Sequence, residues 1–360
     1  MSRAVDERIA AAVAEAERRG SCFAPTNEAE RRAADRRLVT ARPHAGELVS
    51  PVRGLYARAG FWQGLDPVAR SAAVACGLAT QHPDWTFCGP TAAILYGLPV
   101  SYADAATVHV STKGSSFPDF GGGGVGVDAN ARVAVCHHEL RGAPALVSGV
   151  RVTGYWRTIF DCLAGMAFPD ALAVADAVVR VQMIAPEDLA QILRGGYPRC
   201  PGVRRAAEVA GLADARAENG GESVARGVLI ELGRTPTDLQ VTFAPLVQGD
   251  PVMRVDFLWV GENGILVAGE FDGRVKYEDP AHMGGRDTVG VLLDERQRES
   301  RITAYGVPIV RFTMADLRRP EQLARRLDAF GVPLDGGRRR ANPGRGTVYK
   351  DGDMLIYATE

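Results

Sequence analysis

The chain has 360 residues, of which 46% are hydrophobic and 24% are charged, and its formal net charge at pH 7 is −1. This length predicts two or three domains, and the composition is ordinary for a protein that folds in water. A charge balance so close to zero excludes a uniformly basic nucleic-acid binder. No stretch approaches the roughly 18 apolar residues of a membrane span, and the N-terminus has no signal-peptide core, so we expect a cytoplasmic protein that makes no membrane contact.

The six cysteines are dispersed and show no Cys-x-x-Cys pair and no zinc-type spacing with histidines. We therefore expect reduced and mostly buried thiols. Cys136, His137 and His138 are adjacent, but neighbouring residues of a strand point to opposite faces of the sheet. This triplet therefore does not predict a metal site.

Residues 1–60 are predicted to form a small helical unit followed by a β-hairpin. Apolar residues recur at helical spacing from Ile9 to Ala16, and Thr26 or Asn27 is the expected cap of a second helix. Two short apolar runs then flank a turn that contains Pro51. This order is typical of a winged-helix unit, although a charged helical hairpin that only solvates a domain surface has the same pattern.

Arginines outnumber acidic residues in this segment and concentrate between Arg31 and Arg58. Such a concentration would meet phosphates if the segment docks on DNA. The candidate nucleic-acid-binding residues are Arg31, Arg32, Arg36, Arg37 and Arg53.

Residues 61–197 are predicted to form an α+β domain, followed by a basic linker over 198–221. Small residues from Thr91 to Ala93 allow close helix packing, Gly97 is a helix C-cap, and Arg157 with Asp161 is an i,i+4 pair on a later helix. We interpret all of these as structural. The glycine run 121–126 lacks the Lys-Ser/Thr of a phosphate loop, so we interpret it as a strand connection.

Residues 222–333 are predicted to form a third domain, and its strands contain acidic residues. Val255, Phe257 and Trp259 alternate with Asp256 and Leu258, which is the period of a strand. A turn signal over 261–264 leads into a second strand over 265–271, which contains Glu270. A carboxylate in an apolar strand costs several kcal/mol unless it is paired, hydrogen-bonded or bound to a metal.

The register of this hairpin decides what the two acids do. If Asp256 faces Glu270, their Cβ atoms lie about 5 Å apart on one face and can share a divalent cation. A slip of one residue puts them on opposite faces, and the sequence does not fix the register. The alternative is that both acids form hydrogen bonds or ion pairs with arginines and bind no metal.

The segment from Glu222 to Phe330 resembles the PD-(D/E)XK nuclease superfamily, in particular its DUF559-type branch, through its strand aspartate and its Glu-x-Asp-Gly sequence at 270–273. The resemblance implies Asp256 and Glu270 as metal ligands, Mg²⁺ as the cofactor and Glu222 as a further acid on the preceding helix. Asp272 stands where the superfamily has its lysine. Lys276 is the nearest basic substitute, but in an extended strand it would lie about 20 Å from Glu270 unless Gly273 bends the chain.

A second resemblance covers the N-terminal and middle regions. The stretch from Arg36 to Tyr56 is similar to the wing of AbiEi-type antitoxin and regulator proteins, and the helix that ends in Gly97-Leu98-Pro99 is similar to that family's Gly-Leu-Pro helix. The strand at 149–153 followed by Arg157-Thr158 and Asp161 extends the likeness. This resemblance implies DNA as a partner and allows a toxin partner.

Beyond the hairpin we expect a charged helix over 294–301, a strand over 307–312, a closing helix over 315–330 and a basic, mobile tail over 334–360. The sequence thus predicts a mixed α/β chain with an N-terminal winged-helix-like unit, an α+β middle domain and a C-terminal restriction-endonuclease-like domain. The preferred function is a bacterial DNA-binding regulator or antitoxin-like protein that carries a nuclease-fold domain. The alternatives are an active Mg²⁺-dependent DNA endonuclease of a defence or repair system and a protein-interaction module with a degenerate nuclease fold.

Overall fold

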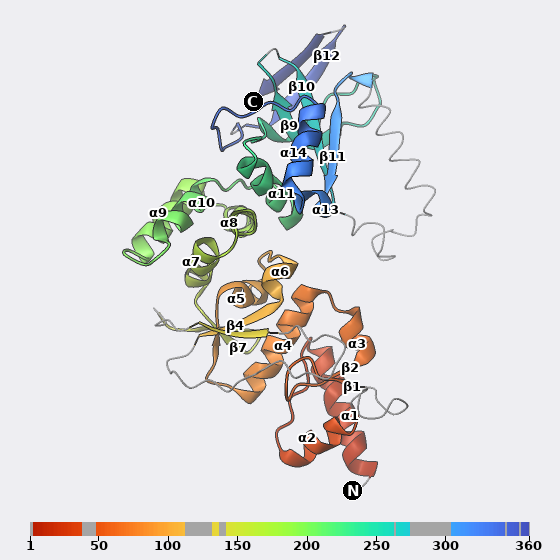
Figure 1. Ribbon diagram of the computed structural model, residues 1–360, viewed down its shortest axis with the longest axis vertical. Helices are drawn as coiled ribbons and strands as arrows, with labels where there is room; N and C mark the ends of the chain where they lie inside the picture. Colours follow the sequence, from red (N-terminus) through yellow and green to blue (C-terminus); the bar gives the residue numbers. More distant parts are fainter. Residues whose placement is uncertain are drawn as a thin grey trace. The chain divides into compact units, whose positions relative to one another are not determined.

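The computed structural model describes residues 3–37, 48–111, 132–136, 142–262, 264–273, 304–342, 344–352 and 354–359. It is a mixed α/β structure, which confirms the predicted class. The chain folds into two compact units, unit 1 comprising Met1–Met166 with Gln191–Ala207 and unit 2 comprising Ala167–Ala190 with Glu208–Glu360. Each unit has its own sheets and buried core (Figure 1).

Unit 1 begins with two helices and a short β-hairpin, in the predicted order. These elements are α1 (Arg3–Arg18), α2 (Glu28–Asp35), β1 (Leu48–Val49) and β2 (Ala57–Arg58). Asn27 is the N-cap of α2, because its side chain accepts a hydrogen bond from the Glu30 backbone N–H at 2.9 Å. Apolar residues of both helices pack on Phe23, Leu48 and Tyr56 and form a small core.

The rest of unit 1 is built on a five-stranded sheet with the order β5-β4-β3-β7-β6. Its strands are β3 (Thr86–Phe87), β4 (Thr107–Ser111), β5 (Arg132–Cys136), β6 (Ala145–Val147) and β7 (Val150–Val152). Its helices are α3 (Ala59–Gly64), α4 (Pro67–Gln81), α5 (Gly89–Leu95), α6 (Tyr102–Ala105) and α7 (Tyr155–Gly165). Helices α9 (Pro186–Gly196) and α10 (Val203–Gly211) carry the chain between the units.

The middle region contains the glycine helix end and the ion pair that the sequence predicts. The buried Thr91 hydroxyl accepts a hydrogen bond from the His109 backbone N–H at 2.8 Å, which ties α5 to β4. Gly97 has a φ of 76° just after α5, a conformation that favours glycine at a helix C-terminus. The Arg157 guanidinium and the Asp161 carboxylate form an i,i+4 ion pair at 2.8 Å on α7.

Unit 2 contains a six-stranded sheet with the order β11-β10-β9-β8-β12-β13. Its strands are β8 (Asp238–Phe243), β9 (Met253–Val260), β10 (Leu266–Asp272), β11 (Ile309–Thr313), β12 (Gly346–Asp351) and β13 (Met354–Thr359). Its helices are α8 (Phe168–Gln182), α11 (Gly220–Glu231), α13 (Met314–Leu317) and α14 (Pro320–Ala329). Neighbouring strands are antiparallel except for the β10–β11 and β8–β12 pairs, which are parallel.

Two apolar clusters make the core of unit 2. The first, which we call the α11 cluster, joins the sheet to α11, α13 and α14 (Figure 1), and its buried residues are Ala225, Val228, Leu229, Leu239, Phe257, Trp259, Val267, Val310, Phe312, Leu317, Leu323, Leu327 and Val332. The second, the β12 cluster, consists of Val241, Phe243, Met253, Val255, Leu258, Leu266, Ala268, Tyr305, Val307 and Val348.

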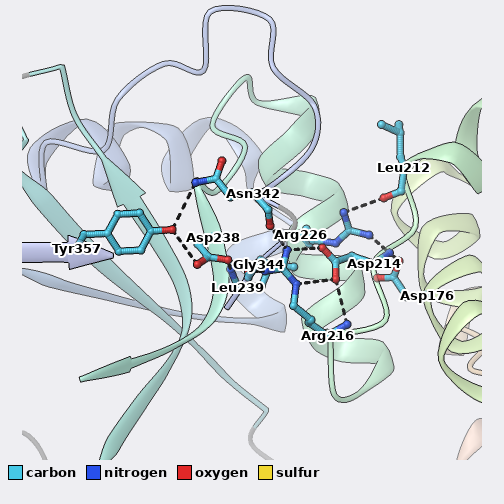
Figure 2. Close-up of polar contacts among 10 residues, drawn as sticks. All are labelled: Asp176, Leu212, Asp214, Arg216, Arg226, Asp238, Leu239, Asn342, Gly344 and Tyr357. Carbon is cyan, nitrogen blue, oxygen red and sulfur yellow. Dashed lines mark hydrogen bonds and ion pairs between the residues drawn. The ribbon is translucent and has the colours of Figure 1, made fainter. Parts of the chain in front are cut away.

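Helix α8 and the C-terminal strands are joined to the sheet by a polar network around two arginines (Figure 2). The Arg226 guanidinium pairs with Asp176 of α8 at 2.6 Å, and it also donates to the Leu212 carbonyl at 3.0 Å. The Arg216 guanidinium pairs with Asp214 at 2.7 Å and with Asp238 of β8 at 2.6 Å. Arg216 also donates to the carbonyls of Asn342 and Gly344, so it holds the segment that leads into β12.

The structure corrects two predictions for the C-terminal region. The predicted mobile tail is wrong for 346–359, because β12 pairs with β8 and β13 pairs with β12. The predicted helix over 315–330 is divided, since α13 ends at Leu317 and α14 starts at Pro320. Proline disfavours the helical conformation in the preceding residue, and Arg319 accordingly has φ −127° and ψ 64°.

Several predicted features lie outside the described residues: Lys276, the charged helix 294–301, the glycine run 121–126, and His137 with His138. Cys22, Cys88 and Cys162 are buried and Cys76 and Cys200 are half-buried, and none of these five cysteines is in a disulfide. None of the described helices combines the length and apolar character needed to cross a membrane.

Candidate functional site

Four polar side chains of unit 2 occupy one row across neighbouring strands. The pairing of β9 with β10 matches Phe257 with Gly269, so its continuation sets Asp256 opposite Glu270. The β8–β9 pairing matches Leu239 with Phe257 and Val241 with Val255, so Gln240 lies at the position opposite Asp256. The β10–β11 pairing matches Glu270 with Arg311. We call this set, Gln240, Asp256, Glu270 and Arg311, the acidic row. The register of this hairpin, which the sequence leaves open, is therefore the one whose continuation by one pair sets the two acids at opposite positions.

The strands are irregular where the acidic row crosses them. Residues two apart on a regular strand share one face of the sheet. Leu239 nevertheless packs in the α11 cluster and Val241 in the β12 cluster, and Phe257 and Val255 are divided in the same way. Each strand therefore changes the face that it packs against the α11 cluster, β8 at Gln240 and β9 at Asp256.

The backbone of Gln240 explains this change on β8. Its φ is 54°, in the left-handed region that residues other than glycine seldom adopt. Such a conformation costs on the order of 1 kcal/mol or more, so the surrounding contacts must hold it. Strained backbone in a buried strand is a feature that functional sites share, and here it coincides with the acidic row.

Glu222 reaches the same place from the first turn of α11. Asn219 caps this helix by accepting a hydrogen bond from the Glu222 backbone N–H at 3.0 Å. The Glu222 carboxylate accepts in turn from the Glu218 backbone N–H at 2.8 Å and from the Asn219 side chain. It is buried, and it also accepts from the Gln240 amide nitrogen of the acidic row at 3.0 Å.

The Gln240 amide lies between two carboxylates. Its Nε2 donates to Oε2 of Glu222 at 3.0 Å and approaches Oδ1 of Asp256 at 3.4 Å. Because one nitrogen reaches both groups, the helix acid and the strand acid are neighbours in space although they are far apart in sequence. The other end of the same amide, Oε1, is buried and has no hydrogen-bond partner among the described residues.

Asp256 and Glu270 also have partners within the protein. The Phe271 backbone N–H donates to Oδ2 of Asp256 at 2.9 Å, which joins β9 to β10 near the end of their pairing. The Glu270 carboxylate is buried and forms an ion pair with Arg311 at 3.2 Å. These contacts tie each acid to a neighbouring strand.

The surroundings of Glu222 favour its protonated form. Burial raises the pKa of Glu222 to about 7, and the negative charges of Asp256 and Glu218 act in the same direction. The hydrogen bond from the Glu218 backbone N–H and the positive charge of Arg254 lower this pKa but do not cancel the effect of burial. The site therefore contains one carboxyl group that titrates near neutral pH.

The predicted metal ligands, Asp256 and Glu270, lie on the adjacent strands β9 and β10, and the Gln240 amide contacts both Asp256 and Glu222. No group of three or more His, Cys, Asp or Glu side chains within the described part of the chain is arranged to hold a metal ion. The oxygen-rich donor set suits a hard cation such as Mg²⁺, which prefers carboxylates and amide oxygens. A cation would be held by the two strand acids, while the neighbouring Gln240 amide turns its nitrogen toward Asp256.

Asp272 is the remaining described residue of the predicted catalytic set. It is half-buried at the end of β10, where its register partner is Thr313 of β11. It lies two positions after Glu270, with Phe271 between them, so alternation points both side chains to the same face of the strand.

The predicted nucleic-acid-binding arginines of unit 1 lie on or near the surface. Arg31, Arg32, Arg36 and Arg53 are exposed and Arg37 is half-buried. Arg32 forms an ion pair with Glu28 at 2.9 Å, so part of its charge is balanced. A Cβ atom at Gly54 would lie 3.1 Å from the Arg31 guanidinium, which shows that Arg31 of α2 reaches the loop that contains Arg53.

The sequence does not identify Gln240, Arg254 or Arg311 as site residues. Gln240 has a weak signal as a polar residue in the apolar run 239–243. Arg254 and Arg311 carry no such signal, because an arginine at alternate positions of a strand is usually a solvated side chain. Their relation to the acids depends on strand pairing, which only the folded chain supplies.

Comparison with known proteins gives two relatives and no assignment. The chain is 28% identical over 242 residues to an uncharacterized protein of Mycobacterium tuberculosis strain H37Rv, covering 67% of this chain and 79% of the relative. An uncharacterized protein of Mycobacterium tuberculosis strain CDC 1551 matches with the same identity and coverage. No family model matches the chain. No solved structure matches it either.

Proposed function

We propose that this protein is a bacterial DNA-binding protein whose unit 2 is a Mg²⁺-dependent DNA endonuclease of the PD-(D/E)XK type. The observation that carries the proposal is the acidic row: the β9–β10 register, continued by one pair, sets Asp256 opposite Glu270, and the Gln240 amide contacts both Asp256 and Glu222. Two strand acids with a helix acid next to them match the arrangement that the DUF559-type resemblance implies. We thus favour the enzyme over the regulator that the sequence alone suggests.

The residues of the row have distinct roles in this proposal. Asp256 and Glu270 would hold the Mg²⁺ ion, which polarises the scissile phosphate and activates water. The Phe271 N–H fixes Asp256, and Arg311 fixes Glu270, so neither carboxylate has to be ordered when the substrate arrives. Arg254 lies close enough to influence Glu222 and is half exposed, so it is suited to contact a phosphate of the bound strand.

Unit 1 supplies the DNA contacts in this proposal. Its two helices and hairpin place exposed arginines on α2 and on the loop before β2, and Arg31 lies near Gly54 between them. Arginines on such a surface bind phosphates without reading sequence and give a strongly salt-dependent affinity. The AbiEi-type resemblance of this region supports DNA as the partner, and a toxin partner remains part of the proposal.

The direct test is cleavage of supercoiled plasmid DNA by the purified full chain in Mg²⁺ or Mn²⁺, beside an Asp256→Asn variant. We expect the parent to nick or linearise the plasmid in the presence of either cation and to be inactive in EDTA. The Asp256→Asn protein should be inactive under all three conditions while it remains folded by circular dichroism. Cleavage at equal rates by both proteins would contradict the proposal.

A regulator with a nuclease fold that does not cleave DNA is the second candidate. The contacts of Asp256 with Phe271 and of Glu270 with Arg311 favour it, because they satisfy both acids without a cation. This candidate predicts that the parent binds DNA in a gel-shift titration and leaves plasmid intact at millimolar Mg²⁺ and Mn²⁺. A protein-interaction module would neither bind nor cleave DNA.

We also propose that the protein is located in the cytoplasm, because free thiols such as Cys22 and Cys76 are typical of a reducing compartment.

A further inference from the structure

Gln240 is the one residue of the acidic row whose conformation is costly. It has a left-handed backbone with a φ of 54°, and its side chain is only 6% exposed. Burying an amide away from water is unfavourable unless both of its ends make hydrogen bonds. A glutamine in this position therefore needs a reason beyond packing.

The two ends of the Gln240 amide differ in their hydrogen bonding. Nε2 makes contacts of 3.0 Å and 3.4 Å to the carboxylates of Glu222 and Asp256. Oε1 is buried without a hydrogen-bond partner among the residues that the structure describes. The amide nitrogen thus donates to two acids in the absence of a cation, while the amide oxygen loses its hydrogen bonds to water and gains none among the described residues in return.

A half-turn about the bond between Cγ and Cδ exchanges the two ends without moving the rest of the side chain. Amide nitrogen and oxygen are nearly the same size, so the rotated group occupies the same space. With no cation, the rotated amide would set Oε1 against two carboxylates and would be repelled. With a divalent cation bound by Asp256 and Glu270, Oε1 would be attracted to it, and the N–H groups of Nε2 would be repelled by it.

We propose that Gln240 is a cation-dependent ligand switch, whose amide donates to Glu222 and Asp256 in the free protein and rotates to give Oε1 as an oxygen ligand when a hard divalent cation such as Mg²⁺ or Mn²⁺ binds. The inference rests on the proposed function, because it takes the same acidic row as the cation site. It adds a third oxygen donor that the resemblance does not provide. It also explains why the amide is tolerated between two acids at the cost of an unpaired oxygen.

The test measures Mn²⁺ binding to the full chain by isothermal titration and Mn²⁺-dependent melting by differential scanning calorimetry, so it needs no cleavage. Gln240→Met keeps the length of the side chain and removes both polar ends. Gln240→Glu replaces the amide nitrogen by a second oxygen and adds a negative charge. Gln81→Met is the matched control, because Gln81 is a half-buried glutamine whose amide also makes a hydrogen bond, at 2.8 Å to the Gly54 carbonyl in unit 1.

We expect Gln240→Met to bind Mn²⁺ at least about tenfold more weakly than the parent, and Gln81→Met to bind it equally well. Gln240→Glu should melt below the parent in EDTA, because it brings a further carboxylate to Glu222 and Asp256, and Mn²⁺ should raise its melting temperature by more than it raises that of the parent. A purely structural glutamine predicts no such recovery with Mn²⁺. The melting of Gln240→Glu with and without Mn²⁺ still tests the proposal if Gln240→Met does not fold.

The Asp256→Asn variant separates failure of this inference from failure of the proposed function. If Asp256→Asn loses Mn²⁺ binding while Gln240→Met binds as tightly as the parent, Gln240 is not a ligand and the metal site stands without it. If Mn²⁺ gives Gln240→Glu no more stabilisation than it gives the parent, the switch is likewise overturned. If the parent itself does not bind Mn²⁺ at millimolar concentration, both the switch and the endonuclease proposal are overturned.

Discussion

The Asp176 carboxylate and the Arg226 guanidinium meet at 2.6 Å, and neither side chain is more than 2% exposed. The pair joins α8 to α11, and the Asp214 backbone N–H donates to the same carboxylate at 2.8 Å (Figure 2). Burial raises the pKa of Asp176, an effect that the positive charge of Arg226 opposes. Removing one partner of such a pair leaves an uncompensated buried charge, which costs about 3–5 kcal/mol. Helix α8 is therefore part of the core of unit 2.

This pair leads to a prediction about fragments. The predicted nuclease domain, 222–333, lacks α8, β12 and β13, so Arg226 would be unpaired and β8 would lose a neighbouring strand. We expect a fragment of residues 167–360 to fold cooperatively and a fragment of residues 222–333 to be degraded rapidly by a nonspecific protease. Limited proteolysis with thermal melts monitored by circular dichroism would measure this. A protease-resistant 222–333 fragment would show that the helix and the hairpin are dispensable.

The second prediction concerns the C-terminal hairpin. A Cβ atom at Gly346 would clash with the Tyr357 ring and would lie 2.5 Å from Oδ2 of Asp238. Gly346→Ala should therefore push β13 from β12 or break the hydrogen bond from the Tyr357 hydroxyl to Asp238, at a cost of more than about 2 kcal/mol.

The matched control is Gly195→Ala in α9, where an added Cβ meets no atom within 4 Å. There alanine should stabilise the protein by about 0.5–1 kcal/mol, because it has the higher helix propensity. Urea denaturation of both variants gives the two free energies of unfolding. Equal stability of Gly346→Ala and the parent would mean that β12 and β13 are not packed as described.

A third prediction uses the raised pKa of Glu222. An acid whose folded pKa lies above its unfolded value of 4.5 favours folding when it is protonated, so its contribution is full below pH 4.5 and is lost as the pH rises through about 7. The parent should therefore lose stability between pH 5 and pH 8 relative to Glu222→Gln. The difference should be about 1–3 kcal/mol, allowing for residual solvent screening. Parallel pH dependence of the two unfolding free energies would show that Glu222 is ionised throughout.

The fourth prediction concerns DNA affinity. Replacing Arg36, Arg37 and Arg53 together by alanine should weaken binding to all DNA sequences and lower the slope of log affinity against log salt by up to about 3, near one unit per lost phosphate contact. The control replaces three other exposed arginines, Arg151, Arg194 and Arg204, by alanine. Gel-shift titrations at several salt concentrations measure both slopes. An equal loss in both triple variants would mean that net charge, and not this surface, determines the affinity.

The hairpin that carries the acids is predictable from sequence because its signals are local. The predicted strands over 254–259 and 265–271 correspond to β9 at Met253–Val260 and β10 at Leu266–Asp272. Their alternation and the turn between them depend only on residues near in sequence. The amino-acid pattern, together with the resemblance it carries, therefore predicts the acids Glu222, Asp256 and Glu270 as candidate site residues.

The partners of those acids are not predictable in this way because they depend on pairing between distant strands. The sequence prediction contains no strand over 238–243, although apolar and polar residues alternate there, and so Gln240 has no assigned neighbour in it. The left-handed backbone of Gln240 is also held by tertiary contacts and has no local sequence signal such as glycine. In the same way, the basic composition of the last residues conceals the strand-forming run that becomes β12.

The parallel pairing of β8 with β12 also constrains how the protein can be made. Asp238 and Tyr357, which the sheet brings into hydrogen-bond contact, are 119 positions apart in the chain. At a synthesis rate of about 5–20 residues per second, the ribosome needs on the order of 10 s to produce the second after the first. During that interval β8 has β9 on one side and an open edge on the other, with Val241 and Phe243 deprived of Val348. The nascent chain should therefore expose this strand edge and its apolar side chains until β12 has been synthesised.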